Sequence, residues 1–203
     1  EKLRELIKSR IIGKISVINT TFSFKSEDSH IDRRLLKDLG TGGILDVGCY
    51  PISMVRLIVG EALGVNSLEP EEIFGVSYLD DAGIDGCSVC CAKFSGEILA
   101  QVSCGISVSQ DQGVKIYGSE GYILIKSPCI PGGRNPAITE IILYMYNNTD
   151  PKIFYIETKV GSSNFMIDDF VKSMSDRSSW ASFSEEALMN MKTLDRWRAS
   201  SNV

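Results

Sequence analysis

The feature that most constrains the fold is a series of short strand-like segments in the middle of the chain. Between residues 73 and 158, runs rich in β-branched and aromatic residues alternate with clusters of Gly, Pro, Asp and Asn. Such clusters supply hairpin turns, so neighbouring segments are expected to pair antiparallel. The segments are 73–79, 87–94, 97–109, 113–118, 121–126, 138–147 and 152–158.

Segment 97–109 shows the clearest alternation. Apolar side chains, among them Ile98, Val102 and Val108, occupy every second position. Because successive side chains of a strand point to opposite faces, one face of this segment is apolar and the other is small and polar. The pattern predicts a sheet that is covered on one side and open on the other. The polar positions are Gln101, Ser103, Gly105, Ser107 and Ser109.

Helical patterns lie on both sides of the strand series. Residues 1–10 place apolar residues on one helical face, and a strand is expected to follow Gly13. After a polar loop over 25–41, a helix is expected to run to about Val59 and to stop at Gly60. Two further helices are expected over 164–176 and 182–200. In the last one we expect core packing of an apolar stripe: Leu188, Met191, Leu194 and Trp197.

These elements predict one domain over residues 1–203, because no linker or shift in composition divides the chain. Its class is α+β, with a large, mostly antiparallel open β-sheet and helices packed on one face. A length of 203 residues is sufficient for a substantial core.

Charge and hydropathy exclude several classes of function. The net charge is −5 and no Lys/Arg cluster is present, so we expect no nucleic-acid partner. Arg56 interrupts the longest apolar stretch, so we expect no membrane span. The first residues, EKLRELIKSR, lack the apolar centre of a secretion signal, which favours a cytoplasmic location.

The cysteines do not suggest a metal site. Cys87, Cys90 and Cys91 lie in one strand-like run, where Cys90 points away from the other two. His30 is the only histidine and has no partner at zinc-ligand spacing. We therefore expect reduced, packed cysteines and no bound metal.

The stretch GGILDVGCYP, residues 42–51, combines potential chemistry with residues that weaken helices. Asp46 and Tyr50 are four residues apart and would share a face in a helix. Pro51 predicts either a kink or a regular helix that starts there, and the second case would place Tyr50 at a cap position. In a purely structural interpretation, Asp46 is an acid in the first turn of the helix, where the helix dipole favours a negative charge, and Tyr50 is a half-buried aromatic residue.

The order of several motifs resembles the C-terminal domain of the Gfo/Idh/MocA oxidoreductases, named from glucose-fructose oxidoreductase and inositol dehydrogenase. The motifs are IGKI before a strand, GGILDVGCYP with Arg56 after it, KIYGSEGYILI, NFMIDDFVKSM and FSEEALMNMKTLDRWRAS. Many relatives have histidine at the position of Tyr50. The tyrosine makes this chain most similar to the branch of dimeric dihydrodiol dehydrogenase and xylose dehydrogenase.

The resemblance implies a fold like that of dihydrodipicolinate reductase and a two-domain enzyme of which this chain is the second half. The chain carries neither a GxGxxG turn nor an EKP motif, which the family has in its Rossmann domain. NADP or NAD would therefore be bound mainly by that missing domain. The fragment alone is expected to be inactive.

The resemblance also implies roles for individual residues. Tyr50 would be the catalytic acid/base, since a carbinol must lose its hydroxyl proton when it loses hydride. A phenol has an ordinary pKa of about 10 and needs a nearby cation to act as a base, which the family supplies by a lysine of the first domain. Asp46 would orient Tyr50, the lysine or a substrate hydroxyl. Arg34 is expected to contact substrate, the alternative being a surface charge. Gly43 is expected to contact substrate because a glycine allows a ligand to approach closely, and Arg56 is expected to have a structural role.

The expected substrate is a sugar, a polyol or a trans-dihydrodiol, and the expected activity is NAD(P)-dependent oxidation or reduction at a CH–OH group. Relatives associate through the open face of the sheet, so a homodimer or higher homo-oligomer is expected. The alternative is a non-catalytic binding or assembly module that kept the fold.

Overall fold

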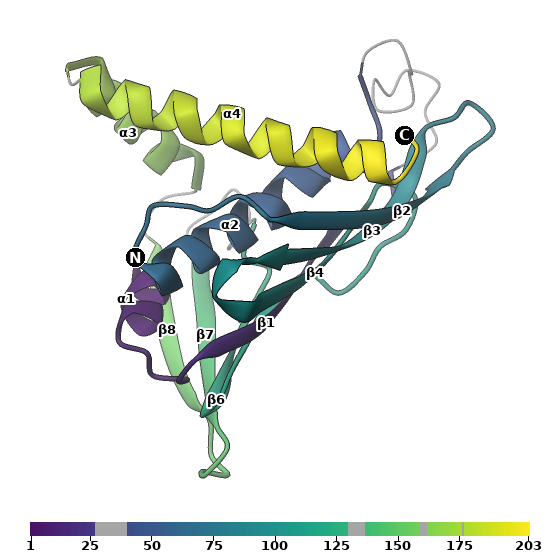
Figure 1. The fold of residues 1–203 in the computed structure, drawn as a ribbon. Helices are drawn as coiled ribbons and strands as arrows, with labels where there is room; N and C mark the ends of the chain where they lie inside the picture. The colour runs from purple at the N-terminus through teal and green to yellow at the C-terminus, as the bar shows by residue number, and fades with distance from the viewer. Residues whose placement is uncertain (27–39, 130–136, 159–161, 176) are drawn as a thin grey trace.

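The computed structural model of the protein describes residues 1–26, 40–129, 137–158, 162–175 and 177–203. Its main element is an eight-stranded sheet with helices against one of its faces (Figure 1). The helices are α1 (Lys2–Lys8), α2 (Cys49–Leu63), α3 (Ser162–Ser175) and α4 (Arg177–Ser200). The strands are β1 (Ile15–Ser23), β2 (Glu72–Leu79), β3 (Asp85–Phe94), β4 (Ile98–Gly105), β5 (Gly113–Gly118), β6 (Gly121–Lys126), β7 (Ala137–Met145) and β8 (Lys152–Thr158).

The strand order is β2-β3-β4-β1-β5-β6-β7-β8, and the sheet is antiparallel except between β1 and β4. The predicted class, a mostly antiparallel open sheet with helices on one face, is confirmed. The parallel pair was not predicted. It arises because β1 lies between β4 and β5, far from its neighbours in sequence, and a parallel pair needs such a long crossover.

The covered face holds the core. Ile18 of β1, Val102 of β4 and Ile116 of β5 are fully buried there, as are Val55 and Ile58 of α2. Helix α1 packs against α2. It lies near the β8 edge of the sheet, where the Lys2 ammonium is 5.2 Å from the ring centre of Phe154.

The open face has three parts that the sequence pattern did not separate. The middle is polar, as predicted, with Gln101 exposed on β4 beside Asn19 of β1. The β2 edge is apolar, and the β5–β7 side carries tyrosines, of which Tyr122 and Tyr144 stack at 4.4 Å between ring centres. The exposed apolar side chains at and near the β2 edge are Phe74, Val76, Tyr78, Val89 and Leu99.

Three expected boundaries were wrong. Helix α4 begins at Arg177 rather than at Ser182. Strand β4 ends at Gly105 rather than Ser109, because the N–H groups of Ile106 and Ser107 both donate to the carbonyl of Gly86. Helix α2 continues past Gly60 to Leu63 and is capped by Gly64 with φ +78°. Gly60 has a packing role instead, since a Cβ there would lie 2.6 Å from Cα of Ser67.

The expected core stripe of the last helix is half confirmed. Leu194 and Trp197 of α4 are fully buried, whereas Leu188 and Met191 are exposed. The reason is geometric: the C-terminal half of α4 lies over β2, and its N-terminal half extends beyond the sheet (Figure 1). None of the described helices is long and apolar enough to cross a membrane.

Candidate functional site

A widened helical turn carries the candidate site. Residues Ile44–Gly48 form a π-helical turn, which continues directly into α2. The α-helical part begins at Cys49, so Tyr50 is its second residue and not a cap, and Pro51 stands in the first turn, where a proline is tolerated. The alternative in which the regular helix starts at Pro51 is therefore wrong. Single π turns are frequent at functional sites.

Tyr50 lies half exposed at the start of α2, supported by β1. Its ring meets the ring of Phe22 edge to face, with 5.2 Å between ring centres and an interplanar angle of 83°. Partial burial raises the pKa of Tyr50 above its ordinary value, and the negative charges of Cys49, Asp46 and Cys129 raise it further when those groups ionise. Tyr50 is thus held as a neutral phenol, which can donate a proton or a hydrogen bond.

Asp46 lies on the π turn one turn before Tyr50. Its N–H donates to the carbonyl of Gly42 at 3.0 Å, which fixes the turn. Its charge raises the pKa of both Cys49 and Tyr50, so the carboxylate is within electrostatic reach of the phenol. The structure therefore brings Asp46 and Tyr50 together as the spacing predicted. That Asp46 orients a ligand stays a prediction.

The glycines of the motif pack against the protein. A Cβ on Gly48 would lie 3.1 Å from Sγ of Cys104 and 3.2 Å from the Trp197 ring. Gly43 is buried, and a Cβ there would lie 3.2 Å from both the carbonyl oxygen of Asp85 and Cα of Gly105. This packing accounts for the absence of a side chain at Gly43. A substrate contact of Gly43 stays a prediction.

Asp85 was missed in the sequence and is central to the geometry. It begins β3, is 1% exposed, and accepts a hydrogen bond of 2.7 Å from the N–H of Ile44. The sequence holds only a weak signal for it: an acid at the start of a strand otherwise composed of small and apolar residues. Its partner lies 41 positions away, so no local pattern could reveal the pairing.

The two arginines considered from the sequence differ in outcome. Arg34 lies outside the described residues. Arg56 has a structural role, as expected: its guanidinium is buried in α2 and pairs with Glu186 of α4 at 2.6 Å and with Glu69 at 2.8 Å. This ion pair fixes α4 over α2.

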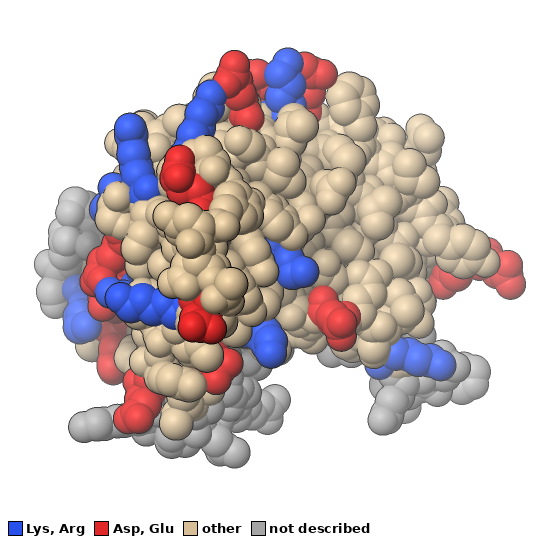
Figure 2. Space-filling model, turned by 90° about the horizontal axis from the view of Figure 1, so that it is seen from below, with Lys and Arg blue, Asp and Glu red and all other residues tan. Residues whose placement is uncertain are grey.

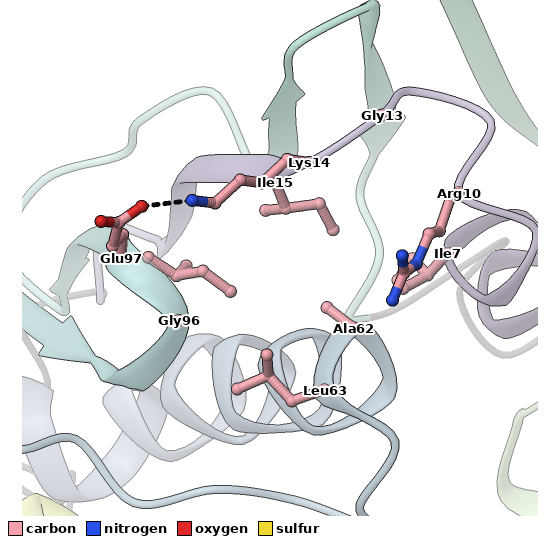
Figure 3. A pocket seen from close by; sticks show the side chains of 10 residues that line it. Ile7, Arg10, Gly13, Lys14, Ile15, Ala62, Leu63, Gly96 and Glu97 are labelled. Carbon is pink, nitrogen blue, oxygen red and sulfur yellow. Dashed lines mark hydrogen bonds and ion pairs between the residues drawn. The ribbon is translucent and has the colours of Figure 1, made fainter.

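A well-formed cavity lies away from Tyr50. A pocket of about 750 Å³ lies at the opposite end of α2, between Ala62 and Leu63, the residues before β1 and the turn at Gly96 (Figure 3). The 15 residues of α2 separate it from Tyr50 by about 20 Å, at 1.5 Å per residue. It is therefore not the Tyr50 site.

No group of three or more His, Cys, Asp or Glu side chains that could hold a metal ion occurs among the residues with a described position. All six cysteines are free thiols. Cys90 is buried while Cys91 is exposed, so these neighbours face opposite sides of β3, as predicted.

A family model described as the GFO/IDH/MocA C-terminal domain matches residues 1–124. Among curated proteins, the chain is 28% identical over 127 residues to the trans-1,2-dihydrobenzene-1,2-diol dehydrogenase of Xenopus tropicalis, covering 63% of this chain and 36% of that protein. It is 25% identical over 122 residues to the D-xylose 1-dehydrogenase (NADP(+)) 2 of Haloferax volcanii, covering 60% of this chain and 35% of that protein. The chain thus spans about a third of the length of these relatives.

Solved structures match over nearly the whole chain. KijD10, a 3-ketoreductase from Actinomadura kijaniata solved with NADP and TDP-benzene, aligns with a TM-score of 0.81 at 17% identity. The match covers 98% of this chain and 57% of that one. Aldose-aldose oxidoreductase from Caulobacter crescentus aligns with a TM-score of 0.76 at 14% identity, covering 98% of this chain and 57% of that one. At these identities the matches establish the fold.

Proposed function

The chain belongs to the GFO/IDH/MocA family through its C-terminal domain, and from this premise we propose that it is the substrate-binding and oligomerisation domain of an NAD(P)-dependent oxidoreductase. Its substrate is a sugar, a polyol or a trans-dihydrodiol. The observation that carries the proposal is Tyr50, a neutral and half-exposed phenol at the start of α2 with Asp46 one turn away.

The described residues fit the reacting end of a nicotinamide cofactor. Tyr50 offers an exposed phenol to a carbonyl or hydroxyl group, whereas the chain carries no GxGxxG turn for a diphosphate. The cofactor, NADP or NAD, supplies or accepts hydride when it is bound. The curated xylose dehydrogenase is named for NADP(+), and KijD10 was solved with NADP.

Tyr50 has a different task in each direction of the reaction. In reduction, its O–H donates a proton to the oxygen of the substrate carbonyl as that oxygen gains negative charge. In oxidation, the substrate hydroxyl must give its proton to a phenolate, so the pKa of Tyr50 has to fall. Every described group that acts on Tyr50 raises its pKa. A cation from another part of the enzyme is therefore required, and this chain alone is proposed to be inactive.

Asp46 is proposed to orient Tyr50, the lysine of the first domain or a substrate hydroxyl, since it precedes Tyr50 by one turn and its charge raises the pKa of the phenol. Arg34 and Gly43 are proposed to contact substrate. Gly43 has no side chain, so its contact would be through its backbone.

We propose that two copies associate through the open face of the sheet. A groove of about 490 Å³ on this face combines polar Asn19 and Gln101 with apolar Phe74, Val76 and Val89. Seen from below, the molecule presents a broad area without Lys, Arg, Asp or Glu (Figure 2). A surface of this kind suits a symmetric interface between identical chains. A cytoplasmic location is proposed because all six cysteines are free thiols.

The test of the activity is Tyr50→Phe in the intact protein. The substitution removes only the hydroxyl group and keeps the edge-to-face contact with Phe22. We expect turnover with NADP or NAD on a panel of sugars, polyols and dihydrodiols to fall about 10²- to 10⁴-fold, with an unchanged circular dichroism spectrum. Tyr155→Phe, at an exposed position on β8, is the matched control and should keep full activity. Normal turnover of Tyr50→Phe would remove Tyr50 from the mechanism, whereas a lack of turnover in the wild-type protein on the whole panel would favour a non-catalytic binding module.

A further inference from the structure

We infer that Asp85 is a positioning residue for Tyr50: its carboxylate holds the first N–H of the π turn and so sets where the phenol stands. The inference rests on the proposed function of Tyr50. Asp85 belongs to β3, whereas Tyr50 and the π turn belong to the segment that leads into α2. It is buried behind the π turn and touches no reacting group.

The contact is short and fully enclosed. Oδ2 of Asp85 accepts the N–H of Ile44 at 2.7 Å and the hydroxyl of Ser88 at 3.1 Å. Ile44 is the first residue of the π turn and is itself fully buried. The first N–H groups of a helix lack partners within the helix, and a carboxylate at this end is favoured by the helix dipole.

The glycine pair is shaped around this carboxylate. Gly42 has φ +108°, a backbone conformation that other residues rarely adopt, and a Cβ there would lie 1.7 Å from Oδ1 of Asp85. A Cβ on Gly43 would lie 3.2 Å from the carbonyl oxygen of Asp85. The motif therefore has glycine at both positions because the start of β3 occupies the space of their side chains.

The carboxylate is costly to bury. Desolvation is the main influence on Asp85, and it raises the pKa of this group despite the hydrogen bonds from Ile44 and Ser88 and the positive charge of Arg198. A neutral residue could fill the same space without this cost. The cost is partly offset because an oxygen at this position accepts the N–H of Ile44, a group that is expensive to bury without an acceptor.

The position of Ile44 is transmitted to Tyr50 by the rigid turn. The π turn runs without a break into α2, and its inner side chains, Ile44 and Val47, are buried against the sheet. A shift of the first N–H therefore moves the second residue of α2. A displacement of about 1 Å at a reacting group can cost about 100-fold in rate.

The experiment compares Asp85→Ala with Asp85→Asn in the intact protein. Asparagine keeps an oxygen that can accept both the Ile44 N–H and the Ser88 hydroxyl, which share Oδ2 in Asp85. For Asp85→Ala we expect kcat to fall about 10- to 100-fold with KM changed less than about threefold. Asp85→Asn should restore most of kcat. An equal loss in both variants, or no loss in Asp85→Ala, would overturn the inference.

A second experiment compares alanine substitutions at Gly42 and at Gly40, which serves as the control. Gly42→Ala forces a methyl group onto Asp85, whereas Gly40→Ala also places an alanine at positive φ, +63°, but with no atom within 4 Å of the new Cβ. We expect Gly42→Ala to lose kcat as Asp85→Ala does and Gly40→Ala to retain it. Equal behaviour of the two glycine variants would count against Asp85 as the cause.

Two readouts do not depend on turnover and separate this inference from the proposed function. Amide hydrogen exchange at Ile44 should speed up at least tenfold in Asp85→Ala and stay slow in Asp85→Asn. The ultraviolet titration of Tyr50, read against Tyr50→Phe, should shift in Asp85→Ala only. If Ile44 exchange rises while the Tyr50 titration stays in place, Asp85 holds the turn without positioning the phenol, and the inference fails even if Tyr50 is catalytic.

Discussion

The two faces of the sheet follow opposite rules, although the same strands form both. On the covered face, Trp197 of α4 packs on Gly48 and Gly75; a Cβ on Gly75 would lie 2.4 Å from the Trp197 ring, and one on Gly48 would lie 3.2 Å from it. On the open face, Phe74 and Val76 of β2 are more than two-thirds exposed. Close fit on the first face fixes the position of Tyr50. Exposure on the second leaves room for another molecule.

The covered face can be broken most severely at Trp197. Replacing this fully buried ring by alanine should lower the free energy of unfolding by about 3–5 kcal/mol, because it removes buried apolar area and leaves a cavity. Denaturant unfolding of the intact protein measures the loss. Tyr78→Ala, which truncates an aromatic residue on the open face, should change the same quantity by about 0.5 kcal/mol or less when the protein is monomeric. Similar losses in the two variants would refute the contrast.

The pH dependence of the unfolding free energy tests whether Asp85 is desolvated on the covered face. Since burial raises the pKa of Asp85 above 3.8, the folded state holds this proton more tightly than the unfolded state. Stability from this group is therefore present below pH 3.8 and is lost as the pH rises through the raised pKa. The unfolding free energy of wild type minus that of Asp85→Asn should fall over this window and then level off. A difference that is constant with pH would show that Asp85 is not desolvated.

The open face should show the smallest effect on stability and a clear effect on association. Val76→Asp places a charge on an exposed position of β2, so the free energy of unfolding of the monomer should change by about 0.5 kcal/mol or less. Self-association, measured by sedimentation, should weaken about tenfold or more. Val65→Asp, in the loop after α2, is the control and should associate normally. Unchanged association of Val76→Asp would place the interface elsewhere.

Short-range patterns in the sequence predicted the parts of the molecule that depend on neighbouring residues. Alternation predicted the strands, and the spacing of Asp46 and Tyr50 predicted their proximity. Gly60 was misread as a helix stop because the loop residue that packs on it, Ser67, was not recognised as its neighbour. Asp85 was missed because its partner, Ile44, is reached only through the folded sheet. Long-range pairs of this kind leave no periodic trace.

The π turn shows the same limit at one residue. From the sequence, Pro51 allowed a kink or a late helix start. In the structure, Gly42, Gly43 and Gly48 each avoid a contact with another element, and together they let the chain enter α2 through a wide turn. The residues that occupy the space beside these glycines, and so determine how α2 begins, are Asp85, Cys104 and Trp197. They come from three other elements.

The place of β1 in the sheet bears on the order in which the chain assembles. β1 precedes the other seven strands of this sheet in the sequence, yet Val17 pairs with Leu99 on one side and with Tyr117 on the other. The hairpins β2-β3-β4 and β5-β6-β7-β8 can form from local sequence, but only β1 joins them into one sheet. Such high contact order slows folding. β1 can therefore pair on both sides only after β4 and β5 have been made, so the part of the sheet that supports Tyr50 depends on segments about 100 residues apart.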